Sequence, residues 1–291
     1  MTPLNKGTHV KLNAAHGDHP AGAVGVIARL NGDGTARVDF PDGTHATFPE
    51  DALVQRKISR REALLPARDP RDFAPYIQYT CVVGSRAFGL DTESSDTDLR
   101  GFYLPPARDH WSLRGVPEQL EWGEEAYWEI GKFLTLGLKG NPNILECLYT
   151  PLVTHATPLA RELLDLRGAF LSTNVYDTYN GYVLSQFAKL EADWRTVGAP
   201  RPKHAMHLIR LLLSGIAVLE GGEVMVHVGA HRDALLDIKA GRMPWEDVNA
   251  WRLRLHRQFD DARTRTRLPE HPDVDRVNAY LLRAREHART L

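Results

Sequence analysis

Residues 82–90 have the sequence VVGSRAFGL, and residues 94–101 have the sequence SSDTDLRG. An apolar run ends in Gly84-Ser85, a polar loop follows, and Asp96 and Asp98 then lead into a second apolar run. This order predicts a strand that ends in a tight, phosphate-holding turn, beside a strand that carries two candidate metal ligands. We expect the rest of the chain to support this site.

Asp96 and Asp98 are two residues apart, so on a strand their side chains project from the same face. Two carboxylates that close repel each other unless a cation lies between them. Mg²⁺ (or Mn²⁺) suits such oxygen ligands, and Mg²⁺ commonly bridges to substrate phosphates. The same Asp-x-Asp spacing also occurs in turns and caps, so it needs support from other residues. Arg86 is a candidate either for neutralising a polyphosphate or for a structural ion pair.

Composition sets the limits of the fold and of the partners. The 291 residues are 43% apolar and 25% charged with a formal net charge of −1, which predicts a folded protein without a general nucleic-acid signature. A nucleic-acid partner would require a local basic patch. No run approaches 18 consecutive apolar residues, and the N-terminus lacks the apolar core of a signal peptide. Cys81 and Cys147 are expected to be reduced core residues, so we predict a cytoplasmic protein without a membrane segment.

The chain is expected to be α+β, with four parts. Residues 1–57 contain short apolar alternations separated by the turn sequences NGDG (31–34) and PDG (41–43), which predict a small SH3-like β-barrel. This module could be a docking appendage or could bind RNA or another partner. Residues 58–73 form a predicted linker with a short helix, and a basic cluster spans the boundary between barrel and linker (Arg56, Lys57, Arg60, Arg61, Arg68 and Arg71).

An α/β core is predicted over residues 74–155 and a helical domain over residues 156–291. In the core, strands are expected at 77–83, 99–104 and 119–128, with helices at 129–139 and 143–148. Three-and-four apolar spacing predicts further helices over 159–166, 175–191, 204–220, 230–240, 244–263 and 272–289. Asn141 and Asn143 are expected in turn and cap roles.

Other phosphate and metal motifs are excluded. The sequence has no GxxxxGK[ST] motif, so a P-loop is not expected. In a calcium loop counted from Asp91, the sixth position is Asp96 where an EF-hand requires glycine.

Gly84-Ser85 followed by Asp96-x-Asp98 resembles the signature of the DNA polymerase β-like nucleotidyltransferase superfamily. The strings GSRAFGL, SSDTDLRGFYLPP and KFLTLGLKGNPNILECL are similar to one branch, the predicted nucleotidyltransferases associated with RNA repair and RNA ligase operons. The resemblance covers about residues 78–240. It implies a mixed sheet flanked by helices and transfer of a nucleoside monophosphate from an NTP.

The resemblance also implies roles for individual residues. Gly84 and Ser85 would hold the triphosphate, and Asp96 and Asp98 would bind Mg²⁺. The branch places an acidic residue shortly before the Lys-Phe helix, which favours Glu124 as the third catalytic carboxylate and metal ligand. Its rivals are Glu125, Glu129 and Glu121, and because a strand places Glu124 and Glu125 on opposite faces, at most one of that pair should reach the metals.

A second group of polar residues lies over 203–212. On a helix, Lys203, His207 and Arg210 share one face, which would be a cationic surface for a triphosphate or an acceptor. An exposed basic helix face is the alternative, and a similar run in the family branch favours nucleotide binding. Lys132 could also reach a phosphate, although a lysine at a helix start is more often exposed.

The leading hypothesis is therefore an Mg²⁺-dependent nucleotidyltransferase, with RNA (a repair substrate or a tRNA 3′ end) as the favoured acceptor. Proteins and small molecules fit the same core, as in a toxin-like modifier. A catalytically silent nucleic-acid-binding adaptor is the alternative from another class, and the intact Gly-Ser and Asp pair argue against it.

Overall fold

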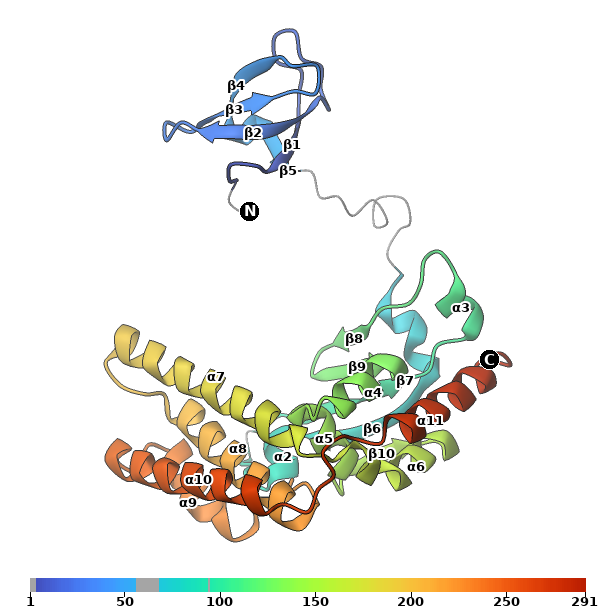
Figure 1. The fold of residues 1–291 in the computed structure, drawn as a ribbon, viewed down its shortest axis with the longest axis vertical. Helices are drawn as coiled ribbons and strands as arrows, with labels where there is room; N and C mark the ends of the chain where they lie inside the picture. The colour runs from blue at the N-terminus through green and yellow to red at the C-terminus, as the bar shows by residue number, and fades with distance from the viewer. Residues whose placement is uncertain (1–3, 56–67, 94) are drawn as a thin grey trace. The chain divides into compact units, whose positions relative to one another are not determined.

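The computed structural model describes residues 4–55, 68–93 and 95–291, which belong to two compact units, residues 1–67 and 68–291 (Figure 1). Most of the predicted linker lies outside the described residues, and so do Arg56, Lys57, Arg60 and Arg61 of the basic cluster. Within the second unit, Arg68 donates to Asp109 at 2.7 Å and lies over the Phe73 ring.

The first unit is a single antiparallel sheet in the order β4-β3-β2-β1-β5. Its inward-facing residues form a small core that includes Val10, Ile27, Val38 and Phe48. The predicted closed SH3-like barrel is not shown, because the pairing within residues 4–55 leaves β4 and β5 as open edges joined by a short 3₁₀ turn. The elements are β1 (His9–Leu12), β2 (Val24–Leu30), β3 (Thr35–Asp39), β4 (His45–Pro49), η1 (Glu50–Ala52) and β5 (Leu53–Gln55).

Both predicted hairpin turns of this unit use the same device. Asp33 accepts hydrogen bonds from the backbone N–H and the hydroxyl of Thr35, at 3.0 and 2.6 Å. Asp42 accepts the same pair from Thr44, at 2.9 and 2.6 Å. These bonds lower the pKa of both aspartates and add to the backbone hydrogen bonds of the turns.

The second unit contains a mixed sheet in the order β10-β6-β7-β9-β8, in which β7 and β9 are parallel and the other pairs are antiparallel. The strand predicted at 119–128 is two strands, because Gly123 (φ +55°) turns the chain between them. Gly101 is required at its place, since a Cβ there would lie 1.8 Å from the carbonyl oxygen of Tyr79. The strands are β6 (Ile77–Val83), β7 (Asp98–Tyr103), β8 (Gln119–Trp122), β9 (Glu125–Glu129) and β10 (Val153–Ala156).

Helices cover this sheet and then form a bundle beside it (Figure 1). One hydrophobic core runs without interruption from the strands to the last helix. The predicted helices are confirmed as α4 (Ile130–Leu138), α5 (Pro142–Tyr149), α6 (Pro158–Asp165), α7 (Asn174–Val197), α8 (Pro202–Gly221), α9 (Arg232–Lys239), α10 (Trp245–Arg265) and α11 (Val274–His287). Shorter helical segments are η2 (Pro70–Tyr76), α2 (Gly84–Phe88), α3 (Ala107–Trp111), η3 (Arg167–Phe170) and η4 (Gly229–His231).

The helix α8 is the centre of the bundle, packed between α7 and α10. Within the described part of the chain, one helix has the length and composition to cross a membrane, and that helix is α8. In its most apolar 18-residue stretch, 67% is buried inside the fold. Such burial is typical of a core helix. The N-terminal turns of α8 line the same cavity as Val83, the last residue of β6.

Candidate functional site

The predicted motif residues line a cavity of about 290 Å³ at the end of the mixed sheet. Gly84 and Ser85 line it from α2, Asp98 from the start of β7, and Asp96 from the loop before β7. Lys203 and His207 of α8 close the other side. The structure therefore brings together six residues that the sequence predicted from two distant segments.

Gly84 and Asp98 are in direct contact. Gly84 has φ +69°, a conformation that favours glycine, and a Cβ at this position would lie 2.4 Å from Oδ2 of Asp98. Val83 pairs with Asp98 across the two antiparallel strands, which fixes this approach. The Asp98 carboxylate also lies 3.7 Å from the Arg100 guanidinium. The turn and the aspartate thus lie against each other, and a side chain at position 84 would displace the Asp98 carboxylate.

Asp96 does not lie on a strand, contrary to the sequence prediction. The strand β7 begins at Asp98, and the backbone before it is held by Arg86. Arg86 donates to the carbonyl oxygens of Ser95, at 2.7 Å, and Asp96, at 3.3 Å. Arg86 is exposed and does not line the cavity. It positions the loop through these backbone contacts, a role different from both predicted alternatives, a structural ion pair and neutralisation of a polyphosphate.

Among the residues that the structure describes, no third carboxylate lines this cavity with Asp96 and Asp98. No group of three or more His, Cys, Asp or Glu side chains within residues 4–55, 68–93 and 95–291 could hold a metal ion. Glu124 is exposed in the turn between β8 and β9, where its carbonyl oxygen accepts from Leu99 N–H and Arg100.

The rival glutamates have other contacts. Glu125 pairs with Leu99 in the parallel register and accepts a hydrogen bond of 2.5 Å from Tyr127, so it lies on the face opposite Asp98. Glu129 is buried, caps α4 and contacts Arg285. Glu121 accepts from Gln119 on the edge strand. Glu124 comes directly before Glu125, and Asp98 comes directly before Leu99, the residue that pairs with Glu125. Glu124 therefore lies next to Asp98 in the parallel register of β7 and β9.

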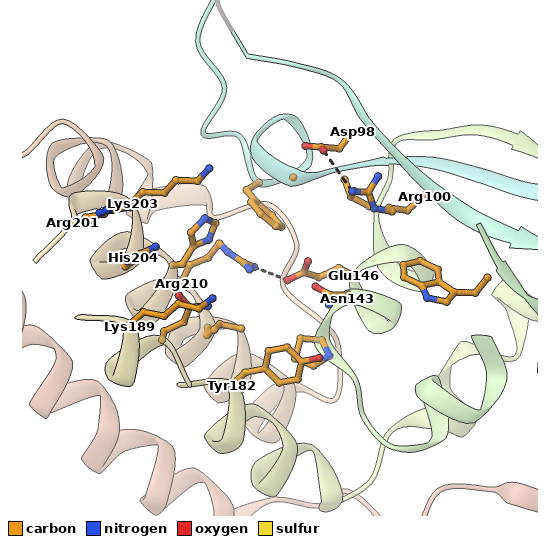
Figure 2. Close-up of a pocket in the computed structure, with 18 residues that line it drawn as sticks. Asp98, Arg100, Asn143, Glu146, Tyr182, Lys189, Arg201, Lys203, His204 and Arg210 are labelled. Carbon is orange, nitrogen blue, oxygen red and sulfur yellow. Dashed lines mark hydrogen bonds and ion pairs between the residues drawn. The ribbon is translucent and has the colours of Figure 1, made fainter. Parts of the chain in front are cut away.

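A second, larger cavity of about 740 Å³ adjoins the first. Gly84, Phe88, Asp98, Lys203 and His207 line both. Figure 2 shows a cationic side facing Asp98 and Arg100, with Asn143 and Glu146 between them. The labelled cations of this side are Lys189, Arg201, Lys203 and Arg210, and His204 lies beside them.

Arg210 has its charge compensated inside the fold. It is buried, donates to Glu146 at 2.6 Å and stacks over the Phe88 ring at 3.8 Å from the centroid. Glu146 is likewise buried. This pair joins α5 and α8 to α2, the helix that begins with Gly84-Ser85. Arg210 therefore lies at the predicted site, but an acidic partner already occupies it.

The pKa of the His207 imidazole is lowered, so the positive charge of the helix face that the sequence described as potentially cationic comes from Lys203 and Arg210. Burial lowers the pKa of its imidazole to about 4, and the charges of Arg210 and Lys203 lower it further. Lys203 is exposed and has no ion-pair partner among the residues the structure describes. It is the cation of this helix that remains available at both cavities.

Comparison with known proteins assigns the family. The family model described as RlaP, RNA repair pathway DNA polymerase beta family, matches residues 57–283. The chain belongs to the RlaP family. This confirms the resemblance inferred from the motif and extends it beyond residues 78–240.

A relative in Bacillus subtilis (strain 168), named "Uncharacterized protein YcgL", is 31% identical over 106 residues. That alignment covers 34% of this chain and 41% of the relative, so the chain spans less than half of the relative's length. No solved structure matches the chain.

The RlaP-family site has donors that suit a divalent cation. Asp96 and Asp98 offer hard oxygen ligands to one cavity, and Mg²⁺ is commonly held by one or two carboxylates when substrate phosphates complete its coordination. Glycine at position 84 leaves the space beside Asp98 free of a side chain. The residues present therefore fit the ion that the sequence predicted.

Several residues that line the two cavities were not found from the sequence. Lys189 and Tyr182 come from α7, where exposed and core positions alternate without any distinguishing motif. Lys239 is an ordinary lysine in the last turn of α9, yet it lines the smaller cavity. Asn143 lines the larger one, while the predicted cap role belongs to Asn141, which accepts from the N–H groups of residues 143 and 144.

Lys132 does not join either cavity. It forms a 2.8 Å ion pair with Glu118 and lines a separate depression beside Glu129.

Proposed function

We propose that this RlaP-family protein is a divalent-metal-dependent nucleotidyltransferase that moves a nucleoside monophosphate from an NTP to a hydroxyl of RNA. The observation that carries the proposal is the contact of Gly84 with Asp98 at a cavity that Asp96 also lines, opposite Lys203. An acidic pair for cations beside a glycine turn and a lysine suits a triphosphate. The family description supports RNA repair as the setting.

In the proposed reaction the acceptor oxygen attacks the α-phosphorus and forms a new O–P bond. The bond from the α-phosphorus to the α,β-bridging oxygen breaks, and pyrophosphate leaves with that electron pair. The proton of the acceptor hydroxyl passes to solvent. A bound Mg²⁺ (or Mn²⁺) would neutralise the developing negative charge. Asp96 and Asp98 would hold it, with Glu124 the candidate third ligand because of its place beside Asp98 in the register.

The protein contributes positioning. Arg86 fixes the backbone at Ser95 and Asp96, the strand pairing fixes Asp98, and Lys203 offers an uncompensated charge to the phosphates. The larger cavity would receive the nucleoside and the acceptor. Its Lys189 and Arg201 offer charges suited to an RNA backbone in a protein whose net charge is only −1.

The test is incubation of the full chain with each labelled NTP, Mg²⁺ and total RNA. Label on RNA that disappears in Asp98→Asn supports the proposal. Label on the protein itself or on an added protein shifts the acceptor to a protein, and label on small molecules shifts it to nucleotidylation of metabolites. Absence of transfer with every NTP and acceptor, under conditions where a related enzyme is active and RNA still binds, would favour a silent adaptor.

A further inference from the structure

Lys239 lines the smaller cavity together with Ser85, Asp96 and Asp98, although it belongs to α9 in the helical part of the fold. Its Nζ donates a 3.0 Å hydrogen bond to the carbonyl oxygen of Leu90, 149 residues away in sequence. The lysine is half-buried, so its ammonium is held in place at the cavity wall.

Two cations of α9, Lys239 and Arg232, donate hydrogen bonds to the loop that follows α2. Arg232, at the start of α9, donates through Nε to the carbonyl oxygen of Gly89 at 2.8 Å. His227 packs against Gly89 from the preceding segment, where a Cβ would lie 2.3 Å from its Nε2. Both cations therefore hold the exit of α2, but of these two only Lys239 lines the cavity.

The hydrogen-bonding capacity of Lys239 is not exhausted by Leu90. An ammonium has three donors, and one of them meets the carbonyl oxygen. Within residues 68–93 and 95–291 no ion pair involves Lys239 or Lys203, so two uncompensated charges face the cavity that Asp96 and Asp98 line. A volume of about 290 Å³ is small for a nucleoside triphosphate and is better matched to its terminal phosphates.

We propose that Lys239 and Lys203 complete a subsite for the β- and γ-phosphates, so that α9 binds the part of the NTP that leaves as pyrophosphate. This inference rests on the proposed nucleotidyl transfer and assigns one of its substrates to a defined cavity. Lys239 is a binding residue in this assignment, and Arg232 is a purely structural neighbour. The two residues are a matched pair, since both donate to adjacent carbonyl groups from the same helix.

The experiment is calorimetric titration of inorganic tripolyphosphate with Mg²⁺ into the full chain and its Lys239→Met, Lys239→Arg and Arg232→Met variants. Loss of a charge-assisted contact should weaken binding roughly 10- to 100-fold in Lys239→Met. Lys239→Arg should retain most of the affinity, and Arg232→Met should bind within about twofold of wild type. Thermal unfolding of each variant checks that the fold is retained.

Equal weakening in Lys239→Met and Arg232→Met would overturn the inference, because it would show that both cations act only by holding the loop. Unchanged binding in a folded Lys239→Met would overturn it as well. If wild type transfers nucleotides while either result holds, the proposed function stands and only the subsite falls. If wild type neither binds tripolyphosphate nor transfers a nucleotide to any acceptor, the proposed function and the subsite fall together.

Discussion

The two sides of the paired cavities are built on different principles. On the acidic side, Gly84 lies against the Asp98 carboxylate, strand pairing with Val83 holds the backbone of Asp98, and Arg86 donates to the carbonyl oxygen of Asp96. On the cationic side, Lys189 and Lys203 are exposed side chains on α7 and α8, and no ion pair within the described ranges restrains them. Small changes of shape on the acidic side should therefore lower activity, whereas on the cationic side binding should change mainly when a charge is removed.

The largest effect is expected on the acidic side. Asp98→Asn and Asp96→Asn each keep the size of the side chain and remove the charge that would hold a cation. We expect nucleotidyl transfer to fall roughly 10³-fold or more. Asp91→Asn is the control, because Asp91 lies in the same loop and lines neither cavity. Initial rates with saturating NTP measure the effect, and full activity in either site variant would remove that aspartate from the assignment.

Substitutions in the buried Glu146–Arg210 pair test whether Arg210 is a structural residue or a member of the cationic side. Removal of one partner leaves a buried charge alone, so Glu146→Ala should lower the free energy of unfolding by about 3–5 kcal/mol. The double variant Glu146→Leu with Arg210→Met should recover much of that loss, because no charge remains unpaired. Urea denaturation measures both.

The NTP affinity of the double variant then distinguishes a structural role of Arg210 from a role in binding the nucleotide. If Arg210 only joins α5 and α8 to α2, the folded double variant should bind NTP nearly as wild type does. A loss of NTP affinity as large as that of Lys203→Met would instead make Arg210 part of the cationic side.

Gly84→Ala tests shape without any change of charge. The new methyl group would lie 2.4 Å from Oδ2 of Asp98. The alanine would also have to adopt a left-handed backbone conformation. We expect activity to fall roughly 10²-fold through displacement of Asp98. Gly198→Ala is a matched control, since Gly198 has φ +75° with nothing within 4 Å of the added Cβ.

The outcome is decided by comparing the two glycine variants. Both should lose about 1–2 kcal/mol of stability from the backbone conformation, measured by thermal unfolding. Equal activity in the two would contradict the claim that the contact with Asp98 matters for the reaction.

The contrast between the two sides also explains what the sequence could predict. Gly84, Ser85, Asp96 and Asp98 lie within 15 positions, so a turn followed by alternating residues identifies them from local rules. The strand at 77–83 and the long helices followed from periodicity in the same way.

Residues that depend on packing could not be found by local rules. Lys239 reaches the cavity only because α9 packs beside the exit of α2, and no local pattern encodes that contact. The helix face of Lys203, His207 and Arg210 was predicted to be polar and potentially cationic, but spacing alone could not show that burial inside the bundle lowers the pKa of His207. The site of the third carboxylate stayed ambiguous for a similar reason, since Gly123 turns a single predicted strand into two.

The smallest effects are expected where single exposed charges meet RNA. Lys189→Met should weaken RNA binding a few-fold and reduce the slope of log affinity against log salt by about 1. Arg201→Met should do less, because Arg201 already shares its charge with Asp193 at 3.2 Å. Arg195→Met, on the same helix as Lys189 but outside both cavities, is the control. Fluorescence titration at several salt concentrations measures the slopes, and an equal slope for the Lys189 and Arg195 variants would place the RNA elsewhere on the protein.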